Sequence, residues 1–307
     1  MKSTKNKAKP FLKWVGGKTQ LLDQLESRLP QKVRKTGVIE RYIEPFVGGG
    51  ALFFYLKSKY KIKKAYLIDT NEDLILTYKV IKKEPKSLIK VLKGIETRYL
   101  KKNESERAKY YYRIRDRYNR QKDKINYRKL DKLWMKQAAY LLFLNKTCFN
   151  GLFRQNRQGK FNVPHGRYKN PKICNEDNLI KVNIALKDTQ VIYGDFSKCR
   201  KYAKPKTLIY FDPPYRPINI TSNFTSYTRN GFCDKEQIRL AKLSKELSEK
   251  EVYVLLSNSD PTNGSNQDNF FHKIYNNFQI KRVFANRMVN CNGDKRGRIK
   301  ELLIANY

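Results

Sequence analysis

The segment Asp212-Pro213-Pro214-Tyr215 directly follows the apolar run Leu208-Ile209-Tyr210-Phe211, and this combination constrains the chain more than any other feature. The apolar run is typical of a buried strand, and open α/β sheets bind their ligands at the carboxyl ends of such strands. The two prolines stiffen the turn and lack backbone donors, so we expect its carbonyl oxygens to accept hydrogen bonds from a ligand. A carboxylate, a carbonyl and an aromatic face suit a planar amine, such as the exocyclic amine of a nucleobase. An ordinary proline-rich turn beside an Asp is the alternative.

Strand and helix signals alternate in the first and last parts of the chain. Strands are expected at residues 38–43, 65–68, 191–193, 208–211 and 252–256, helices at 51–59 and 235–250, and a closing antiparallel pair at 278–284 and 301–306. This alternation predicts an α/β fold with a parallel, Rossmann-like sheet. We expect residues 1–80 and 179–307 to form one domain around that sheet.

Residues 81–178 differ in character. Long helical patterns dominate this segment, which carries 27 Lys and Arg against 9 Asp and Glu. It ends in a Gly-, Asn- and Arg-rich stretch, residues 145–171, without helical periodicity. We therefore predict an inserted helical domain over residues 81–178, with a loop or hairpin that contacts the partner.

Charge and composition restrict the class of partner. The net charge of +38 and the pI of about 10.0 indicate a polyanion, nucleic acid first and an anionic membrane surface second. No apolar stretch reaches the roughly 18 residues of a membrane span, and the start lacks the pattern of a secretory signal. Five cysteines without a CxxC pair, and only two histidines, argue against a disulfide framework or a zinc site. We expect a cytoplasmic, nucleoid-associated protein.

A glycine-rich turn follows the first predicted strand. Gly48-Gly49-Gly50 would let a ligand approach the backbone, and Asp69, at the end of the next predicted strand, could accept from ribose hydroxyls. This pair suits a dinucleotide or S-adenosylmethionine (AdoMet), although the spacing departs from GxGxxG. A tight turn with a helix-capping Asp is the alternative.

Two further segments suit other parts of such a ligand. Lys18, behind Gly16-Gly17, could face a carboxylate, and Trp14 could cover an apolar part of the ligand. An amino-acid carboxylate favours AdoMet over a dinucleotide. Asp195 and Phe196 follow another predicted strand and could hold an adenine ring. Packing, solvation and strand-end capping are the alternatives for these residues.

Together these segments resemble the DNA adenine-N6 methyltransferases of the Dam type, in the α group of amino-methyltransferases. The similarity runs from Phe11 to Tyr307. It rests on FLKWVGGK at 11–18, EPFVGGGALF at 44–53, the acid Asp69, CFNGLFRQNRQGKFNVPHGRYKNP at 148–171, and DPPY at 212–215 followed by NFTSY at 223–227. The order of AdoMet segment, recognition insert and DPPY is that of the α group. Two positions depart from the family pattern: Phe149 stands where many relatives have Tyr, and His165 stands where they often have another aromatic residue.

The resemblance implies an enzyme that transfers the AdoMet methyl group to adenine N6 in duplex DNA, within GATC and without a metal. It implies that AdoMet is bound by Trp14, Lys18, Asp69, Asp195, Phe196 and Asp212. It also implies that catalysis rests on Asp212, Pro213 and Tyr215.

Chemistry assigns a role to each catalytic candidate. The Asp212 carboxylate and the Pro213 carbonyl could accept both N6 protons, which would aim the nitrogen lone pair at the methyl group. The target atom cannot be reached inside a duplex, so the base must flip out, and Tyr215 could stack on it. The loop 216–231 is a candidate lid through Asn223, Phe224 and Tyr227.

Sequence discrimination is expected from the end of the insert. Arg154 suits a bidentate contact to guanine O6 and N7. Phe149 and Asn150 could fill the space of the flipped base, and Leu152 and Pro164 could contact a thymine methyl. Lys13 and Tyr168 complete the predicted DNA contacts.

Three other functions compete with this hypothesis. An RNA methyltransferase would not need the segment 148–171, because the deep groove of RNA is closed to such contacts. A dinucleotide-dependent oxidoreductase would use the glycine turn but neither DPPY nor the insert. A catalytically silent DNA-binding module would need a damaged site. We expect a monomer that binds duplex DNA and no membrane, without a stable complex with any cognate restriction endonuclease.

Overall fold

The computed structural model describes residues 7–14, 16–217, 232–263, 268–286 and 298–307. The chain forms two compact units, and it crosses between them several times. The first unit comprises Met1–Gly17, Gly48–Ser58 and Asp69–Gly194, and the second comprises Lys18–Val47, Lys59–Ile68 and Asp195–Tyr307.

The second unit is built on a mixed sheet. Its strands are β1 (Val38–Glu44), β2 (Lys61–Asp69), β4 (Leu208–Phe211), β5 (Tyr253–Ser259), β6 (Gln279–Asn286) and β7 (Arg298–Ala305). They pair in the order β2-β1-β4-β5-β7-β6. The pairs from β2 to β5 are parallel, whereas β7 is antiparallel to both β5 and β6.

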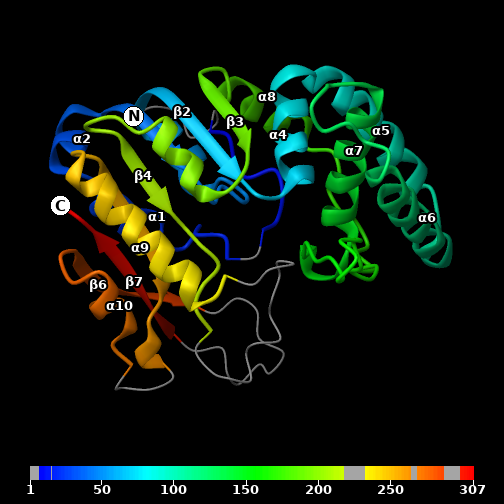
Figure 1. Cartoon of the computed structure of the whole chain (residues 1–307). Coiled ribbons are helices and arrows are strands. Elements are labelled where there is room, and N and C mark those ends of the chain that lie inside the picture. Colours follow the sequence, from blue (N-terminus) through cyan, green and yellow to red (C-terminus); the bar gives the residue numbers. More distant parts are fainter. Residues whose placement is uncertain (1–6, 15, 218–231, 264–267, 287–297) are drawn as a thin grey trace. The chain divides into compact units, whose positions relative to one another are not determined.

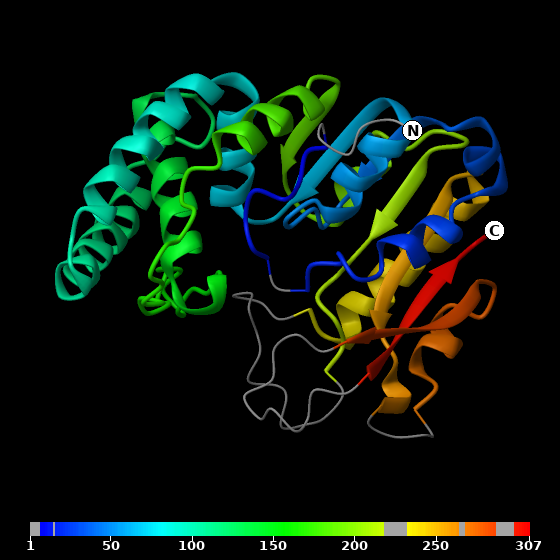
Figure 2. The same cartoon turned by 180° about the vertical axis from the view of Figure 1, so that it is seen from behind.

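Helices cover both faces of this sheet. The helix α9 (Asp234–Glu249) lies along one face (Figure 1), and α1 (Leu22–Ser27) and α2 (Gln31–Thr36) lie on the other (Figure 2). A short helix, α10 (Phe270–Ile274), precedes β6. Because both faces are covered, all four residues of β4 are buried. The predicted strand 208–211 and the predicted antiparallel closing pair are both confirmed, as is the α/β, Rossmann-like fold class.

The first unit is mainly helical. It contains α3 (Ala51–Lys59), α4 (Glu72–Lys83), α5 (Pro85–Leu100), α6 (Glu104–Lys122), α7 (Lys132–Thr147) and α8 (Glu176–Ala185), with the strand β3 (Thr189–Tyr193). Aromatic side chains fill the space around α5, α6 and α7: Tyr99, Tyr111 and Phe143 are fully buried. The predicted insert 81–178 lies wholly inside this unit, and the domain boundaries at 80 and 179 stay a prediction.

The segment after α7 forms a hairpin, which is one of the two forms expected. Isolated bridges join Cys148 to His165 and Gln155 to Phe161. Residues 145–147 were expected outside a helix, but they complete α7, which ends where Cys148 turns extended at φ −80° and ψ 163°. We call residues 148–168 the recognition hairpin.

None of the helices in the described ranges combines the length and hydrophobicity that a transmembrane segment needs. Most of the candidate lid, residues 216–231, lies outside the described residues, and so do Asn223, Phe224 and Tyr227.

The stability of the second unit should depend on the interior of β5. Leu255 is 0% exposed, and Leu255→Ala should lower the free energy of unfolding by about 2–5 kcal/mol through lost burial and a residual cavity. Ile238, on α9, is 38% exposed, so Ile238→Ala should change the free energy by less than about 0.5 kcal/mol. Urea unfolding of both variants measures the contrast, and equal effects would contradict it.

Candidate active site

The DPPY segment begins where β4 ends. β1 and β5 pair with the two sides of β4, so Asp212 follows a central strand of the sheet. The Asp212 side chain is 20% exposed, Pro213 is buried and Pro214 is exposed. The predicted carboxylate therefore lies at the strand end where α/β sheets bind ligands.

The Asp212 carboxylate is held by a cation and a hydroxyl. Lys18 Nζ lies 3.0 Å from Asp212 Oδ1, and Ser257 Oγ donates to the same oxygen over 2.9 Å. Because the Ser257 proton goes to Asp212, the Tyr210 hydroxyl is the donor in its 2.9 Å bond to Ser257 Oγ. Burial raises the pKa of Asp212, and the Lys18 charge and these hydrogen bonds act against that rise. Both contacts are to Oδ1, so a ligand donor would approach Oδ2.

Tyr215 is anchored at its hydroxyl. Its OH donates to Glu301 Oε2 over 2.5 Å, and Lys18 Nζ lies 4.4 Å from the ring centroid. The ammonium lies over one ring face, as in a cation–π contact. A base that stacks on Tyr215 would therefore use the opposite face. Burial raises the pKa of Glu301, which the Lys18 charge partly offsets.

Side chains of β5 and α9 fix the turn itself. Gln237 Nε2 donates to the Pro214 carbonyl over 3.1 Å, and Asn258 Nδ2 donates to Gln237 Oε1 over 3.1 Å. The Arg216 backbone N–H donates to Asn258 Oδ1, and its carbonyl accepts from Ser259 Oγ. The segment behind Asp212 is thus clamped by buried amides and hydroxyls.

One expectation about this turn is wrong in part. Its carbonyl oxygens were expected to be available to a ligand, but the Pro214 carbonyl already accepts from Gln237. The reason is that Gln237 is fully buried on α9, and its amide needs partners. The role of the Pro213 carbonyl as an acceptor for the substrate amine stays a prediction.

Asp195 and Phe196 lie together, but other side chains already engage them. Arg239 donates to both Asp195 oxygens over 2.9 and 2.7 Å, and the Ser197 backbone N–H donates to Oδ1. These bonds hold the pKa of Asp195 well below its ordinary value. The Phe196 ring is 2% exposed, stacks on Phe46 at 5.4 Å and carries the Arg239 guanidinium 4.0 Å from its centroid. An adenine ring bound here would have to displace one of these neighbours.

In the first unit, the glycine turn and Asp69 are joined directly. The Gly48 N–H donates to Asp69 Oδ2 over 3.0 Å, and the Asn71 N–H donates to Oδ1 over 2.9 Å. Burial raises the pKa of Asp69 to about 6, although both backbone bonds lower it. The carboxylate predicted to bind ribose is thus positioned by the turn predicted to approach the ligand.

Trp14 packs on this turn. A Cβ added to Gly48, which has φ +46°, would lie 2.7 Å from Trp14 Cδ1, so only glycine fits there. The indole also stacks on Phe153 at 5.2 Å with an interplanar angle of 19°. Trp14 therefore connects the glycine turn to the recognition hairpin, in addition to any contact with a ligand.

The predicted DNA contacts gather on the recognition hairpin and the segment packed against it. Asn145 accepts from the Lys13 N–H and donates to the carbonyls of Lys13 and Gly151. Lys13 Nζ lies 5.6 Å from the Tyr168 ring centroid. Phe149, at the start of the hairpin, is 52% exposed although it is a large apolar residue.

Arg154 is exposed and held on one side. Its Nε donates to Asn162 Oδ1 over 2.9 Å and one terminal nitrogen donates to the Asn162 carbonyl over 3.3 Å. The guanidinium has five donors, so its outer edge could still form a bidentate contact. Asn150 is exposed at φ +55°, Pro164 is exposed and Leu152 is half-buried.

Sequence reasoning missed the residues that support this site. Ser257, Asn258, Gln237, Glu301 and Arg239 lie 21–86 residues away from the residues that they hold. The triplet Ser257-Asn258-Ser259 was the one available signal, because three polar residues continue an apolar strand. The described residues contain no group of three or more His, Cys, Asp or Glu side chains arranged to hold a metal ion.

These features define an α/β methyltransferase with a basic recognition hairpin, and comparison with known proteins agrees. The sequence model of the D12 class N6 adenine-specific DNA methyltransferases matches residues 14–289. A type II methyltransferase, M.MjaIII from Methanocaldococcus jannaschii, is 49% identical over 97% of this chain and 99% of its own length. DNA adenine methylases of Vibrio cholerae and Escherichia coli are 34% and 31% identical, each over 97% of this chain and 95% of their own length.

The chain therefore belongs to the D12 class of N6 adenine-specific DNA methyltransferases. It is an adenine-specific DNA methyltransferase that acts on DNA, and membership of the family implies AdoMet as the methyl donor.

The Lys18–Asp212 ion pair predicts a pH effect. Asp212 accepts protons only as a carboxylate, so the methylation rate should fall as pH falls through its raised pKa. Lys18→Met removes the cation that favours the ionised form, so the acid limb of the rate should move to higher pH. Single-turnover rates with saturating AdoMet and DNA, from about pH 5 to about pH 9, measure the limb. Lys250→Met, at an exposed ion pair, is the control. If the acid limb of the pH–rate profile does not move in Lys18→Met, Lys18 does not set the pKa of Asp212.

Proposed function

We propose that this enzyme methylates the adenine of GATC in duplex DNA after the base has left the helix. The observation that carries the proposal is the arrangement at Asp212: a carboxylate held through one oxygen, beside an aromatic ring anchored at its hydroxyl. Such a site suits an extrahelical base, because N6 is inaccessible inside a duplex. The likeness of segment 148–171 to Dam-type enzymes supports GATC.

The chain's own groups would act on N6 directly. Asp212 Oδ2 and the Pro213 carbonyl accept the two amine protons, which favours a pyramidal nitrogen. AdoMet, when bound, supplies a methyl group on a sulfonium, so direct transfer needs no covalent enzyme intermediate. One proton must leave N6, and the raised pKa of Asp212 suits a carboxylate that takes it. Tyr215 stacks on the base and keeps the nitrogen in line.

Five residues besides Asp212 are proposed to bind AdoMet. Asp69 accepts from the ribose, because the Gly48 N–H already holds its carboxylate at the turn. Lys18 has three donors, so it can serve a ligand carboxylate while it contacts Asp212. Trp14 covers an apolar part of the ligand, and Asp195 and Phe196 hold the adenine ring after local rearrangement around Arg239.

Recognition is proposed to rest on Arg154. Asn162 orients one side of the guanidinium, and the opposite edge meets guanine O6 and N7. Phe149 and Asn150 fill the space of the flipped adenine, while Leu152 and Pro164 contact a thymine methyl. Lys13 and Tyr168 add contacts to the DNA, which the enzyme meets in the cytoplasm.

Asp212→Ala should abolish methylation and leave binding of duplex DNA measurable, because the carboxylate acts on N6 and not on phosphate. Transfer of labelled methyl groups from AdoMet to duplex DNA, with RNA of the same sequence in parallel, measures the activity. A folded variant that keeps more than about a tenth of wild-type turnover, a change of only ~1.4 kcal/mol, would remove Asp212 from its role. Equal labelling of RNA by the wild type would favour the rival RNA methyltransferase.

Arg154→Ala should cost roughly 1–3 kcal/mol at one guanine position and relax the preference there. Arg157→Ala, three residues further along the same hairpin, is the matched control and should weaken all duplexes about equally. The measurement is kcat/KM on a GATC duplex and on duplexes with each guanine replaced. If Arg154→Ala also lowers the rate equally on every duplex, Arg154 contacts the backbone and does not read a base.

A further inference from the structure

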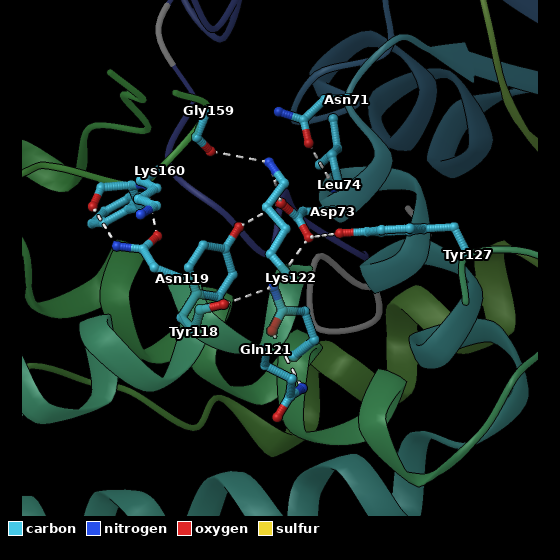
Figure 3. Close-up of polar contacts among 12 residues, drawn as sticks. Asn71, Asp73, Leu74, Tyr118, Asn119, Gln121, Lys122, Tyr127, Gly159 and Lys160 are labelled. Atoms are coloured by element: carbon cyan, nitrogen blue, oxygen red, sulfur yellow. Dashed lines mark hydrogen bonds and ion pairs between the residues drawn. The ribbon is translucent and has the colours of Figure 1, made fainter. Parts of the chain in front are cut away.

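A buried carboxylate outside the catalytic site organises the first unit. Asp73, which Figure 3 labels, lies in the first turn of α4. It is 1% exposed. The Tyr118 hydroxyl donates to Oδ2 and the Tyr127 hydroxyl to Oδ1, each over 2.8 Å, and Gln137 Nε2 donates to Oδ1 over 3.2 Å. Lys122 Nζ lies 3.4 Å from Oδ2. A buried charge is costly unless it is paired and hydrogen-bonded, and here four side chains meet that need.

Lys122 links this carboxylate to the tip of the recognition hairpin. It is the last residue of α6, and its Nζ donates to the Gly159 carbonyl over 3.1 Å (Figure 3). Gly159 has φ +75° and closes the turn, because its N–H donates to the Asn156 carbonyl. The Asn156 side chain also accepts from the Lys160 N–H. The Lys122 ammonium thus connects the Asp73 carboxylate to an ordered turn of the hairpin.

The residues beside Lys122 on α6 fix the returning arm of the hairpin. Asn119 accepts from the Phe161 N–H over 2.8 Å and donates to the Phe161 carbonyl over 3.0 Å. The Tyr118 ring, which contacts Asp73 through its hydroxyl, lies 6.0 Å from the Phe161 ring. The next residue, Asn162, holds the Arg154 guanidinium. A shift of the tip would therefore move the residue proposed to read guanine.

The proposed cofactor acid lies just before α4, at the end of β2. Asp69 lies four residues before Asp73, and its Oδ1 accepts from the Asn71 N–H. Asn71 caps α4, because its side chain accepts from the Leu74 N–H over 2.9 Å (Figure 3). Asp73 thus stands between the cofactor turn and the recognition hairpin, within one unit of the protein.

We propose that Asp73 is a positioning residue that, through Lys122, sets the recognition hairpin against the start of α4, the helix that follows the proposed cofactor acid Asp69. It thereby determines site discrimination without touching DNA. The inference rests on the proposed function, in which Arg154 reads guanine. Lys122 carries the effect because it is the ionic connection from Asp73 to the hairpin turn.

Lys122→Met is the decisive variant. It keeps the length of a side chain that is 25% exposed, whereas removal of Asp73 would leave several buried donors without their acceptor. The ratio of kcat/KM on the GATC duplex to that on guanine-substituted duplexes should fall by about tenfold. The affinity of the free enzyme for AdoMet should stay at the wild-type value, because Asp69 keeps its backbone bonds.

Two matched variants separate positioning from general stability. Lys122→Arg keeps the charge and should restore most of the discrimination. Lys181→Met removes another partly buried lysine that is paired with an Asp, and it should leave discrimination unchanged. In a double-mutant cycle, Asp73→Asn and Lys122→Met should be non-additive in discrimination, because they remove the same contact.

Wild-type discrimination in folded Lys122→Met, or an equal loss of rate on every duplex, would overturn the inference. Additive effects in the cycle would overturn it as well. Different results would contradict the proposed function itself. In that case the wild type would show no guanine preference, or Arg154→Ala would keep the preference intact.

Discussion

The arrangement of side chains at the end of β4 depends on the cost of burying one charge, that of the Asp212 carboxylate. Asp212 is mostly withdrawn from water, so its charge needs partners. Lys18 and Ser257 supply them through a single oxygen, and Lys18 also covers one face of Tyr215. The same contacts that stabilise the Asp212 charge therefore also orient the Asp212 carboxylate and the Tyr215 ring, the proposed acceptor and the proposed stacking ring. Loss of Lys18 would change both the pKa and the position of Asp212, so the geometry of the proposed catalytic site is coupled to the stability of this turn.

Strand register explains how distant residues reach this turn. β5 runs parallel to β4, with Leu256 opposite Phe211, so Ser257, Asn258 and Ser259 continue alongside the residues after β4. β7 runs antiparallel to β5, and its Glu301 lies opposite Ser259. β5 is apolar where it pairs with β4, and its residues become polar beyond the end of β4. There its side chains bind a segment in which prolines have removed backbone donors.

In the first, mainly helical unit, the main requirement is to satisfy the backbone groups of the recognition hairpin. The recognition hairpin has little regular structure, so its backbone groups need partners from elsewhere. Asn145, Asn119 and Lys122 provide them from α6 and α7, and Asp73 in turn neutralises Lys122. A polar framework of this kind suits a reading element, because directional hydrogen bonds define one position where apolar packing would allow several.

The sequence by itself determined the α/β class, the strand limits at 208–211, the glycine turn with Asp69, and the order of the motifs, because periodicity and turn chemistry are local. It also placed Asp212 at a strand end and Arg154 on a non-helical segment. Only the tertiary structure decided that Lys18 meets Asp212, that Gln237 occupies the Pro214 carbonyl, and that Arg239 engages Asp195. These pairings join residues 23 to 194 positions apart, and strand register and helix packing bring them together.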